Sequence, residues 1–396
     1  MIQISPETQL FIREHSSDDV RALALQAKKY PDINMPTAIT QIAGRQVAAE
    51  KIPSWREIEE IWYPKHLSLE QCSSEITARY KARLFQGDSL IDLTGGFGID
   101  CSFLATGFKS ATYVERQEEL CEIAAHNFPI LHLNHINVRN EDGVAYLQTM
   151  SPVDCIFLDP ARRNEHGGKT VAISDCEPNV AELEALLLSK ANRVMIKLSP
   201  MLDLSLALKE LKHTQEVHIL SVNNECKELL ILLGQTSPAE ITIHCVNLFT
   251  KGTQEEQHFV FTREQEQRSQ CTYTDSLGDY LYEPNASLLK AGAFRSIAAA
   301  YPVRKLHPNS HLYTSDTFIE NFPGRIFRIV NQCSFNKKEV KENLADLKKA
   351  NVTVRNFPAT VAELRKRLHL TEGGDTYLFA STLNNGQKVI IRCEKV

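Results

Sequence analysis

The sequence predicts an α/β fold whose central part is a parallel sheet flanked by helices. Between residues 89 and 234, short apolar runs alternate with helical stretches, which is the pattern of strands buried on both faces. The last two runs, residues 216–222 and 228–234, are separated by only five residues. That distance is too short for a crossover helix, so these two strands are expected to form an antiparallel hairpin.

Composition and cysteine usage exclude several classes of protein. The chain of 396 residues is 43% hydrophobic and 23% charged, which is ordinary for a globular protein. It lacks both an apolar run long enough to span a membrane and a secretion signal at its start. The ten cysteines are spaced singly, without a C-x-x-C pair. The sequence therefore predicts a cytoplasmic protein with reduced thiols and no metal ion.

The first 86 residues are predicted to form a helical segment. Serine and aspartate residues at 16–19 can cap a helix, and prolines separate the helices that follow. The first of these helices is expected to end near residue 29. Further helices are expected at residues 37–50, 55–62 and 68–85. Seven strands are expected next, at residues 89–93, 111–115, 136–140, 153–159, 193–199, 216–222 and 228–234.

The last 160 residues are predicted to hold two smaller parts. Residues 237–324 form a β-rich insert, with strands at 241–249 and 258–262 and a loop that enters a helix within 280–294. Residues 325–396 alternate strand, helix, strand, helix and hairpin, with helices expected at 337–350 and 360–370, which is typical of a compact α+β module. The predicted domains are therefore residues 1–86, 87–236, 237–324 and 325–396.

A glycine-rich loop, Asp92-Leu-Thr-Gly-Gly-Phe-Gly98, follows the first strand and precedes a helix. Gly95, Gly96 and Gly98 would let a ligand approach the backbone closely, and the helix N-terminus offers amides to anionic groups. A purely structural turn is the alternative interpretation. A dinucleotide fingerprint would need glycine at position 101, which is Cys101, so a nicotinamide cofactor is disfavoured.

Three acidic residues end successive strands. Glu115 ends the second strand, Asp142 follows the third and Asp159 ends the fourth. Because the carboxyl ends of parallel strands meet at one crevice, the three side chains are expected to face one site. Glu115 could accept the ribose hydroxyls of an adenosine and Asp142 its adenine amino group. Each acid alone could be a solvated strand end, but together they favour an adenosyl cofactor.

With these residues, the segment 89–234 resembles the class I S-adenosylmethionine-dependent methyltransferases, which have a Rossmann-like seven-stranded sheet. The glycine loop is similar to their D-x-G-x-G-x-G motif, with Thr94 in place of the first glycine, and to the D-x-T-A-G-x-G-x-D form of some bacterial rRNA guanine-N2 methyltransferases. The whole chain resembles the bacterial methyltransferases with a THUMP-like C-terminal domain, through PTAI, YEPNASLLKAGAF and NVTVRNFPATVAELRKRL. The resemblance implies S-adenosylmethionine as cofactor, bound by Asp92, Thr94, Gly95, Gly96, Gly98, Glu115 and Asp142.

The segment Asp159-Pro160-Ala161-Arg162 is similar to motif IV of nucleic-acid methyltransferases. Asp159, with the Pro160 carbonyl, would hold the N–H of the acceptor, while Arg162 and Arg163 would bind the substrate or form surface ion pairs. Amino methyltransferases usually carry an aromatic residue where Arg162 stands, but a guanidinium can also stack on a base. Pyrimidine-C5 chemistry is disfavoured because the segment after the fifth strand, IKLSPML, lacks a cysteine. Further substrate-binding candidates, each with a structural alternative, are Lys197, Ser199, Glu283 and Asn285.

Charge is distributed unevenly along the chain. Residues 325–396 carry 14 Lys and Arg against 7 Asp and Glu, a net charge of +7, whereas the other residues have a net charge of −12. Such a module is expected to contact phosphates, and the THUMP-like resemblance also points to RNA. The residues predicted to contact RNA are Lys348, Lys349, Arg365 and Arg367.

The sequence therefore predicts S-adenosylmethionine-dependent methylation of a base nitrogen in RNA, either tRNA or rRNA. Two alternatives remain open at this point. One is a methyltransferase that acts on a small molecule or protein, with the basic module serving assembly. The other is a relative that binds RNA or the cofactor and has lost catalysis.

Overall fold

The computed structural model describes residues 4–162, 172–252 and 256–396 and divides into two compact units. Unit 1 comprises Met1–Gln215 and Leu230–Pro238, and unit 2 comprises Glu216–Leu229 and Ala239–Val396. The four domain boundaries expected from sequence stay a prediction. Among the described residues, no helix has both the length and the apolar character that a membrane crossing requires.

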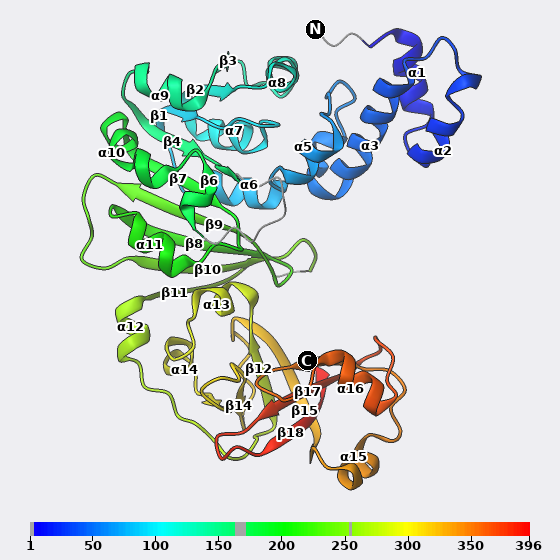
Figure 1. The fold of residues 1–396 in the computed structure, drawn as a ribbon, viewed down its shortest axis with the longest axis vertical. Helices are drawn as coiled ribbons and strands as arrows, with labels where there is room; N and C mark the ends of the chain where they lie inside the picture. The colour runs from blue at the N-terminus through cyan, green and yellow to red at the C-terminus, as the bar shows by residue number, and fades with distance from the viewer. Residues whose placement is uncertain (1–3, 163–171, 253–255) are drawn as a thin grey trace. The chain divides into compact units, whose positions relative to one another are not determined.

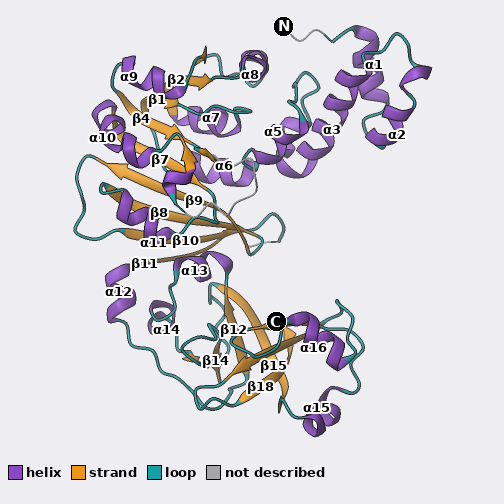
Figure 2. Cartoon of the chain, in the orientation of Figure 1, coloured by secondary structure: helices purple, strands orange, loops and turns teal. Residues whose placement is uncertain are grey.

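The N-terminal part of unit 1 is helical (Figure 2). Its helices are α1 (Pro6–Glu14), α2 (Val20–Leu25), η1 (Ala27–Lys29), α3 (Met35–Lys51), α4 (Pro53–Arg56), α5 (His66–Gln71) and α6 (Glu75–Ala82).

Two helices predicted in this segment differ in the structure. The helix expected at 55–62 is reduced to α4. The backbone N–H of Trp62 donates to Asn127 Oδ1 at 2.9 Å, and Asn127 Nδ2 donates back to the Trp62 carbonyl at 2.9 Å, so this backbone is held outside a helix. The helix expected at 68–85 is split into α5 and α6 because Cys72 and Ser74 adopt extended backbone conformations. This break presents Ser73 to the site described below.

The parallel sheet has the strand order expected for the predicted fold class, which is thereby confirmed. Within unit 1 the order is β9-β7-β4-β1-β2-β3, and all neighbours from β7 to β3 pair in parallel. The strands are β1 (Gly87–Asp92), β2 (Phe108–Glu115), β3 (Ile136–Asn140), β4 (Val153–Leu158), β7 (Ala191–Leu198), β8 (Thr214–Val222) and β9 (Glu225–Gly234). Strands β8 and β9 have residues in both units.

Helices alternate with these strands and cover the sheet within unit 1 (Figure 1). Buried residues of β2 and α8, including Tyr113, Ala124 and Phe128, form one of the packed clusters. The remaining elements of this region are α7 (Ile99–Leu104), η2 (Ala105–Gly107), α8 (Glu118–Ile130), α9 (Gly143–Thr149), β5 (Ala161–Arg162), η3 (Ile173–Asp175), β6 (Cys176–Glu177), α10 (Val180–Lys190) and α11 (Leu204–Glu210).

Unit 2 begins with the predicted hairpin. β8 and β9 are hydrogen-bonded neighbours joined by Asn223 and Asn224, whose φ angles of 50° and 69° are those a type I′ turn requires. Two strands of the predicted insert pair with this hairpin rather than standing apart. β10 (Thr242–Leu248) pairs in parallel with β8, and β11 (Glu256–Thr262) pairs antiparallel with β10.

The remainder of unit 2 is built on a seven-stranded sheet of order β13-β14-β12-β15-β18-β17-β16. β12 pairs with β15, so residues of the predicted insert and of the predicted C-terminal module share this sheet. Its elements are α12 (Arg263–Arg268), β12 (Tyr280–Pro284), α13 (Ala286–Ala291), α14 (Ser296–Ala300), β13 (Arg304–Lys305), β14 (Tyr313–Ser315), β15 (Gly324–Ser334), α15 (Lys337–Leu344), β16 (Asn351–Val354), α16 (Val361–Leu368), β17 (Thr376–Thr382) and β18 (Lys388–Lys395).

The helix predicted at 337–350 ends six residues early, at Leu344. Backbone hydrogen bonds hold the following residues beside Thr371 instead, from Thr371 N to the Lys348 carbonyl at 3.0 Å and from Ala350 N to the Thr371 carbonyl at 3.0 Å. Lys348 and Lys349 therefore lie in a loop rather than on the helix. The second helix, α16, is capped as its sequence suggests, by Thr360 and Glu363.

Candidate functional site

A cavity of about 300 Å³ lies at the carboxyl ends of the parallel strands in unit 1. Its walls come from the loops that follow β1, β2, β3 and β4, together with the break between α5 and α6 and the end of β7. Among the residues predicted from sequence, it is lined by Asp92, Thr94, Gly95, Gly96, Gly98, Glu115, Asp142, Asp159, Pro160 and Lys197.

Two positions in the glycine loop require glycine for different physical reasons. A Cβ at Gly95 would lie 2.2 Å from the ring of Tyr113, so this position is fixed by close packing. Gly96 has a φ of 54°, and the nearest atom to an added Cβ would be the Thr94 carbonyl oxygen at 3.7 Å. Gly96 therefore combines a left-handed backbone with open space beside the cavity, which is the cradle that a bound ligand would need.

The carboxylate of Glu115 is held by backbone N–H groups from two loops of the cavity wall. Its Oε2 accepts the Gly96 N–H at 2.9 Å, and its Oε1 accepts the Gln117 N–H at 2.8 Å. An ionised carboxylate has about four lone-pair sites. Two acceptor positions thus remain for a pair of ligand hydroxyls.

Asp92 and Thr94 connect the glycine loop to Asp159. The Thr94 N–H donates to Asp92 Oδ1 at 3.0 Å, and the Asp159 N–H donates to Thr94 Oγ1 at 2.6 Å. Burial raises the pKa of Asp92 well above its usual value, and the charges of Asp100 and Asp159 raise it further. The threonine in place of the first glycine of the motif thus provides a hydroxyl that joins two walls of the cavity.

Asp142 lines the cavity and also caps a helix. Its Oδ1 accepts the N–H groups of Val144 and Ala145, both at 3.0 Å, at the start of α9. This is the usual role of an N-cap aspartate. The cap fixes the side chain at the cavity wall, where the role predicted for it toward an adenine amino group stays a prediction.

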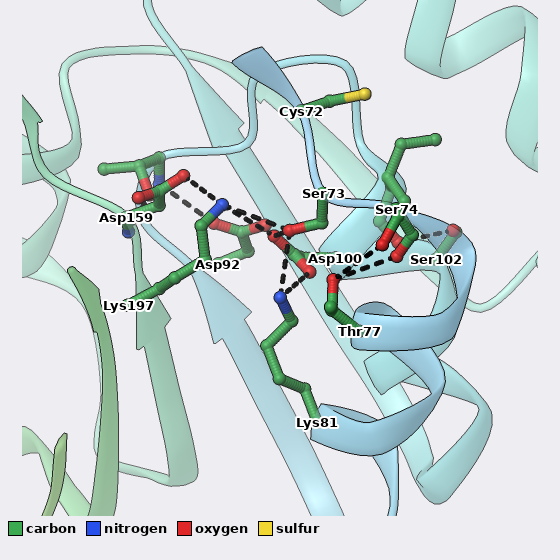
Figure 3. Close-up of polar contacts among 12 residues, drawn as sticks. Cys72, Ser73, Ser74, Thr77, Lys81, Asp92, Asp100, Ser102, Asp159 and Lys197 are labelled. Atoms are coloured by element: carbon green, nitrogen blue, oxygen red, sulfur yellow. Dashed lines mark hydrogen bonds and ion pairs between the residues drawn. The ribbon is translucent and has the colours of Figure 1, made fainter. Parts of the chain in front are cut away.

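A buried network of charged residues lies next to these loops (Figure 3). Asp100, in the first turn of α7, forms ion pairs with Lys81 at 2.9 Å and with Lys197 at 3.3 Å. The Ser73 hydroxyl donates to Asp100 Oδ2 at 2.7 Å and accepts from the two ammonium groups at 2.9 and 3.1 Å. Burial alone would raise the pKa of Asp100, but the two lysines outweigh it and hold that pKa below its usual range.

Lys197 also forms an ion pair with Asp159 Oδ2. Burial raises the pKa of Asp159 above its usual value, and the ammonium group of Lys197 opposes part of that rise. The network therefore runs from Asp159 through Lys197 and Asp100 to Lys81, whose side chain is fully buried. Through these contacts, residues on α6, α7 and β7 fix the position of Asp159.

Sequence reasoning missed Ser73, Lys81 and Asp100. One signal was present, because Asp100 is the last aspartate of DLTGGFGID and corresponds to the final position of the D-x-T-A-G-x-G-x-D pattern. No comparable signal distinguishes Ser73 or Lys81. They are recruited only because the break between α5 and α6 brings this segment against α7.

Three further predicted residues, Ser199, Arg162 and Arg163, differ in what the structure describes of them. Ser199 is not one of the described residues that line the cavity. Its hydroxyl accepts the Met201 N–H at 3.3 Å in a turn. Arg162 pairs with Cys176 through its backbone in the short ladder of β5 and β6. Arg163 lies outside the described residues.

Glu283 and Asn285 belong to unit 2 and have structural roles there. The buried carboxylate of Glu283 accepts from Arg325 Nε at 2.8 Å and forms an ion pair with Arg355 at 3.0 Å. Asn285 Oδ1 accepts the Leu288 N–H at 3.2 Å and so caps α13. Neither residue is among those that line the cavity of unit 1, and the contact of Asn285 is the one that the turn-and-cap interpretation expects.

The four basic residues predicted to bind RNA differ in their surroundings. Lys348, Lys349 and Arg367 are exposed, and the guanidinium of Arg367 lies 4.1 Å from the centre of the Phe335 ring. Arg365 is only partly exposed and pairs with Glu372 at 3.1 Å. Lys348 and Lys349 are therefore the most accessible charges of the four for a phosphate backbone.

Comparison with known families supports a methyltransferase assignment. Residues 57–164 match the family of protein-L-isoaspartate (D-aspartate) O-methyltransferases. Residues 280–323 match a ferredoxin-like domain, and residues 324–395 match a THUMP-like domain. No curated protein matches the chain.

A solved structure from Porphyromonas gingivalis W83, described as that of a methyltransferase, shares 34% sequence identity with this chain. Each chain is covered over 100% of its length, with a TM-score of 0.87. An rRNA methylase from Streptococcus thermophilus shares 13% identity over 40% of this chain and 94% of its own, with a TM-score of 0.30. The TrmK protein of M. capricolum, solved with S-adenosylhomocysteine, shares 12% identity over 41% of this chain and 68% of its own, with a TM-score of 0.32. Neither of the last two similarities is high enough to carry an argument about function.

The fold and the cavity define an S-adenosylmethionine-dependent methyltransferase of class I. Within that class, the full-length similarity and the THUMP-like match place the chain in one family. It belongs to the methyltransferases that carry a THUMP-like C-terminal domain, as the resemblance in its sequence implies.

Proposed function

We propose that the protein binds S-adenosylmethionine in the cavity of unit 1 and methylates a base nitrogen in RNA. The observation that carries this proposal is the hydrogen bond between Thr94 Oγ1 and the Asp159 N–H at 2.6 Å. It ties the backbone of Asp159, whose carboxylate is proposed to face the acceptor, to the glycine loop proposed to hold the cofactor.

The residues of the cavity fit the cofactor. Gly96 has a positive φ and open space where a Cβ would stand, and Glu115 keeps acceptor positions for the two ribose hydroxyls. The carboxylate of Asp142, which caps α9, lines the same cavity and suits an adenine amino group. When bound there, the sulfonium of S-adenosylmethionine would supply an activated methyl group.

Asp159 is the residue proposed to act on the acceptor. Its carboxylate would accept the N–H of the base nitrogen and take up the proton that leaves as the new N–C bond forms and the S–C bond breaks. Correct in-line placement supplies much of the rate in such a transfer. Lys197 and Asp100 would keep this carboxylate aimed at the acceptor, because each ion pair restricts the next side chain in the network.

Glu115→Gln provides the test of the cofactor assignment. Loss of charge-assisted hydrogen bonds is expected to weaken S-adenosylmethionine binding by about 1.5–3 kcal/mol, which is roughly 10- to 150-fold. Calorimetric titration of the full chain measures this. Glu118→Gln, three residues away at the exposed start of α8, is the matched control and should bind normally. Equal affinity in the two variants would contradict the proposed role of Glu115.

RNA as the substrate is supported by the net charge of +7 in residues 325–396 and by the THUMP-like match. The structure refines which charges to test. Lys348 and Lys349 are exposed, and no salt bridge is found for either among the described residues. They form an adjacent pair in the loop after α15.

The double variant Lys348→Glu/Lys349→Glu is expected to bind RNA more weakly and with a flatter salt dependence, because fewer counterions are released per bound molecule. The slope of log K against log[salt] should fall by roughly 0.7–0.9 for each lost phosphate contact. Filter binding at several salt concentrations measures this. Lys28→Glu/Lys29→Glu makes the same change of charge at an exposed lysine pair in η1 and should leave RNA binding unchanged.

An acceptor that is a small molecule or a protein would give a different result. The intact chain would then show no salt-dependent RNA binding, and both double variants would turn over normally. Calorimetry on the Glu115 variant separates the two parts of the proposal. If the intact chain does not bind RNA, the proposed cofactor site is unaffected. If Glu115→Gln binds S-adenosylmethionine normally, the proposed RNA contact of Lys348 and Lys349 is unaffected.

A further inference from the structure

Four side chains that can bind metals are placed together on one face of the sheet in unit 2. Glu216 and His218 lie on β8, two residues apart, so they project from the same face. His244 on β10 is directly opposite His218 in the ladder, and His258 comes from the adjacent strand β11. The residues are separated by up to 42 positions in sequence, and only the strand register brings them together.

Ligand atoms of three of these side chains lie close together. Glu216 Oε2 lies 3.2 Å from His218 Nε2 and 3.8 Å from His244 Nε2. One ligand atom from each of the three lies within 4.8 Å of the other two. Ligand atoms bound to a single zinc ion at about 2.1 Å are about 3.4 Å apart in a tetrahedral site. The measured separations bracket that value.

The fourth residue is placed to orient one of the three. His258 Nε2 lies 3.1 Å from His244 Nδ1, on the side of the ring away from Glu216. A metal-bound histidine commonly uses its other ring nitrogen for a hydrogen bond of this kind, which fixes the tautomer and the direction of the ring. His258 would therefore fix the tautomer of His244 and leave Nε2 to bind the ion.

We propose that Glu216, His218 and His244 bind a divalent transition-metal ion such as Zn²⁺, with His258 as the outer partner of His244. Two imidazoles and a carboxylate are a ligand set that zinc accepts. The Glu216 side chain is 40% exposed, which gives an ion access from solvent. The His218 and His244 rings stack with planes 6° apart and centroids at 4.3 Å, so binding requires the His244 ring to rotate toward Glu216.

The expectation of no metal ion drawn from the sequence rested on cysteine spacing alone. The proposed site uses no cysteine, and its ligands come from two strands. An ion there would join β8 to β10, two neighbouring strands of the sheet. Because such an ion binds only the folded sheet, it would also stabilise the fold.

The test is a titration of the full chain with Zn²⁺, followed by competition with a chromophoric chelator. We expect one tightly bound ion per chain and a rise in the thermal unfolding temperature. The electronic spectrum of the Co²⁺ form should show nitrogen and oxygen ligation without thiolate charge-transfer bands. This last measurement excludes binding to the ten cysteines of the chain.

Graded variants make the assignment specific. His244→Ala should abolish the bound ion, whereas His258→Ala should weaken binding by about 10- to 100-fold, as the loss of an outer partner does. His66→Ala removes an exposed histidine of unit 1 and should bind as the unaltered chain does. Absence of bound Zn²⁺ in the unaltered chain, or equal binding by the His244 and His66 variants, would overturn the proposal.

Discussion

Asp159→Asn is expected to reduce methyl transfer by about 10²- to 10⁴-fold, the range typical of losing a positioned acid or base. The amide is nearly the same size but cannot take up a proton from the acceptor nitrogen. Affinity for S-adenosylmethionine should stay nearly unchanged, because this residue is proposed to face the acceptor. Single-turnover kinetics with an identified RNA, alongside calorimetry, separates the two effects.

Asp154→Asn is the matched control for this experiment. Asp154 lies at the opposite end of the same strand β4, where its Oδ2 accepts the N–H groups of Asp88 at 2.8 Å and Ser89 at 2.9 Å. The Asp154→Asn variant should be less stable but should transfer the methyl group at the normal rate. Wild-type turnover in the Asp159 variant would show that this carboxylate is a structural residue at the end of a strand.

The pH dependence of the unaltered enzyme gives a second check on Asp159. Burial raises the pKa of its carboxyl group above the usual aspartate value. The proposed role needs the ionised form, so activity should fall as the pH drops through this raised pKa. The acidic limb of the rate profile should therefore lie above about pH 4, where an unperturbed aspartate would place it, and should be missing from the residual activity of Asp159→Asn.

Lys81→Met is expected to destabilise unit 1 by roughly 3–5 kcal/mol, because it removes the fully buried partner of Asp100 and leaves that carboxylate incompletely compensated. Lys109→Met, which breaks the exposed pair with Asp88, should leave the unfolding free energy nearly unchanged, because water screens that pair. Each variant removes the lysine ammonium group that pairs with an aspartate, so burial of the pair is the main difference between them.

Tryptophan fluorescence during urea unfolding measures this effect selectively. The chain has two compact units, and a global probe would mix their transitions. Both tryptophans of the chain, Trp55 and Trp62, lie in unit 1, and Trp55 is buried against Phe97. Similar midpoints for the two lysine variants would show that the buried network does not stabilise this unit.

The same network predicts how stability responds to acid. The pKa of Asp100 is lower in the folded protein than in the unfolded chain. Its contribution to stability is therefore present above about pH 4 and is lost as the pH falls toward the folded value. Lys81→Met removes part of that difference, so its unfolding free energy should fall less steeply below pH 4 than that of the unaltered chain.

How much of the cavity could be predicted depended on whether a residue ends a strand. Glu115, Asp142 and Asp159 were located correctly because the carboxyl ends of parallel strands meet at one edge, whatever the details of packing. Ser73 and Lys81 follow no such rule. Their contact with Asp100 arises from the way the N-terminal helices pack against α7.

The basic module shows a similar limit. Its charge and its order of elements were readable, yet Lys348 and Lys349 were placed on a helix that in fact ends at Leu344. The pairing of Ala350 with Thr371 decides this, and helix propensity alone cannot reveal a contact between residues 21 positions apart.

The sequence by itself determined the class of fold, the glycine loop, the three acidic strand ends and the family to which the chain belongs. The first three of these depend on local spacing and on apolar periodicity, which a linear chain displays directly. The family follows instead from the resemblance of its sequence motifs. Only the tertiary structure decided that Glu283 pairs with two arginines in unit 2, that Lys81 and Lys197 both pair with Asp100, and that Glu216, His218 and His244 share one face. Apart from Glu216 and His218, these partners are distant in sequence, and their meeting depends on strand register and helix packing, for which the sequence carries no local signal.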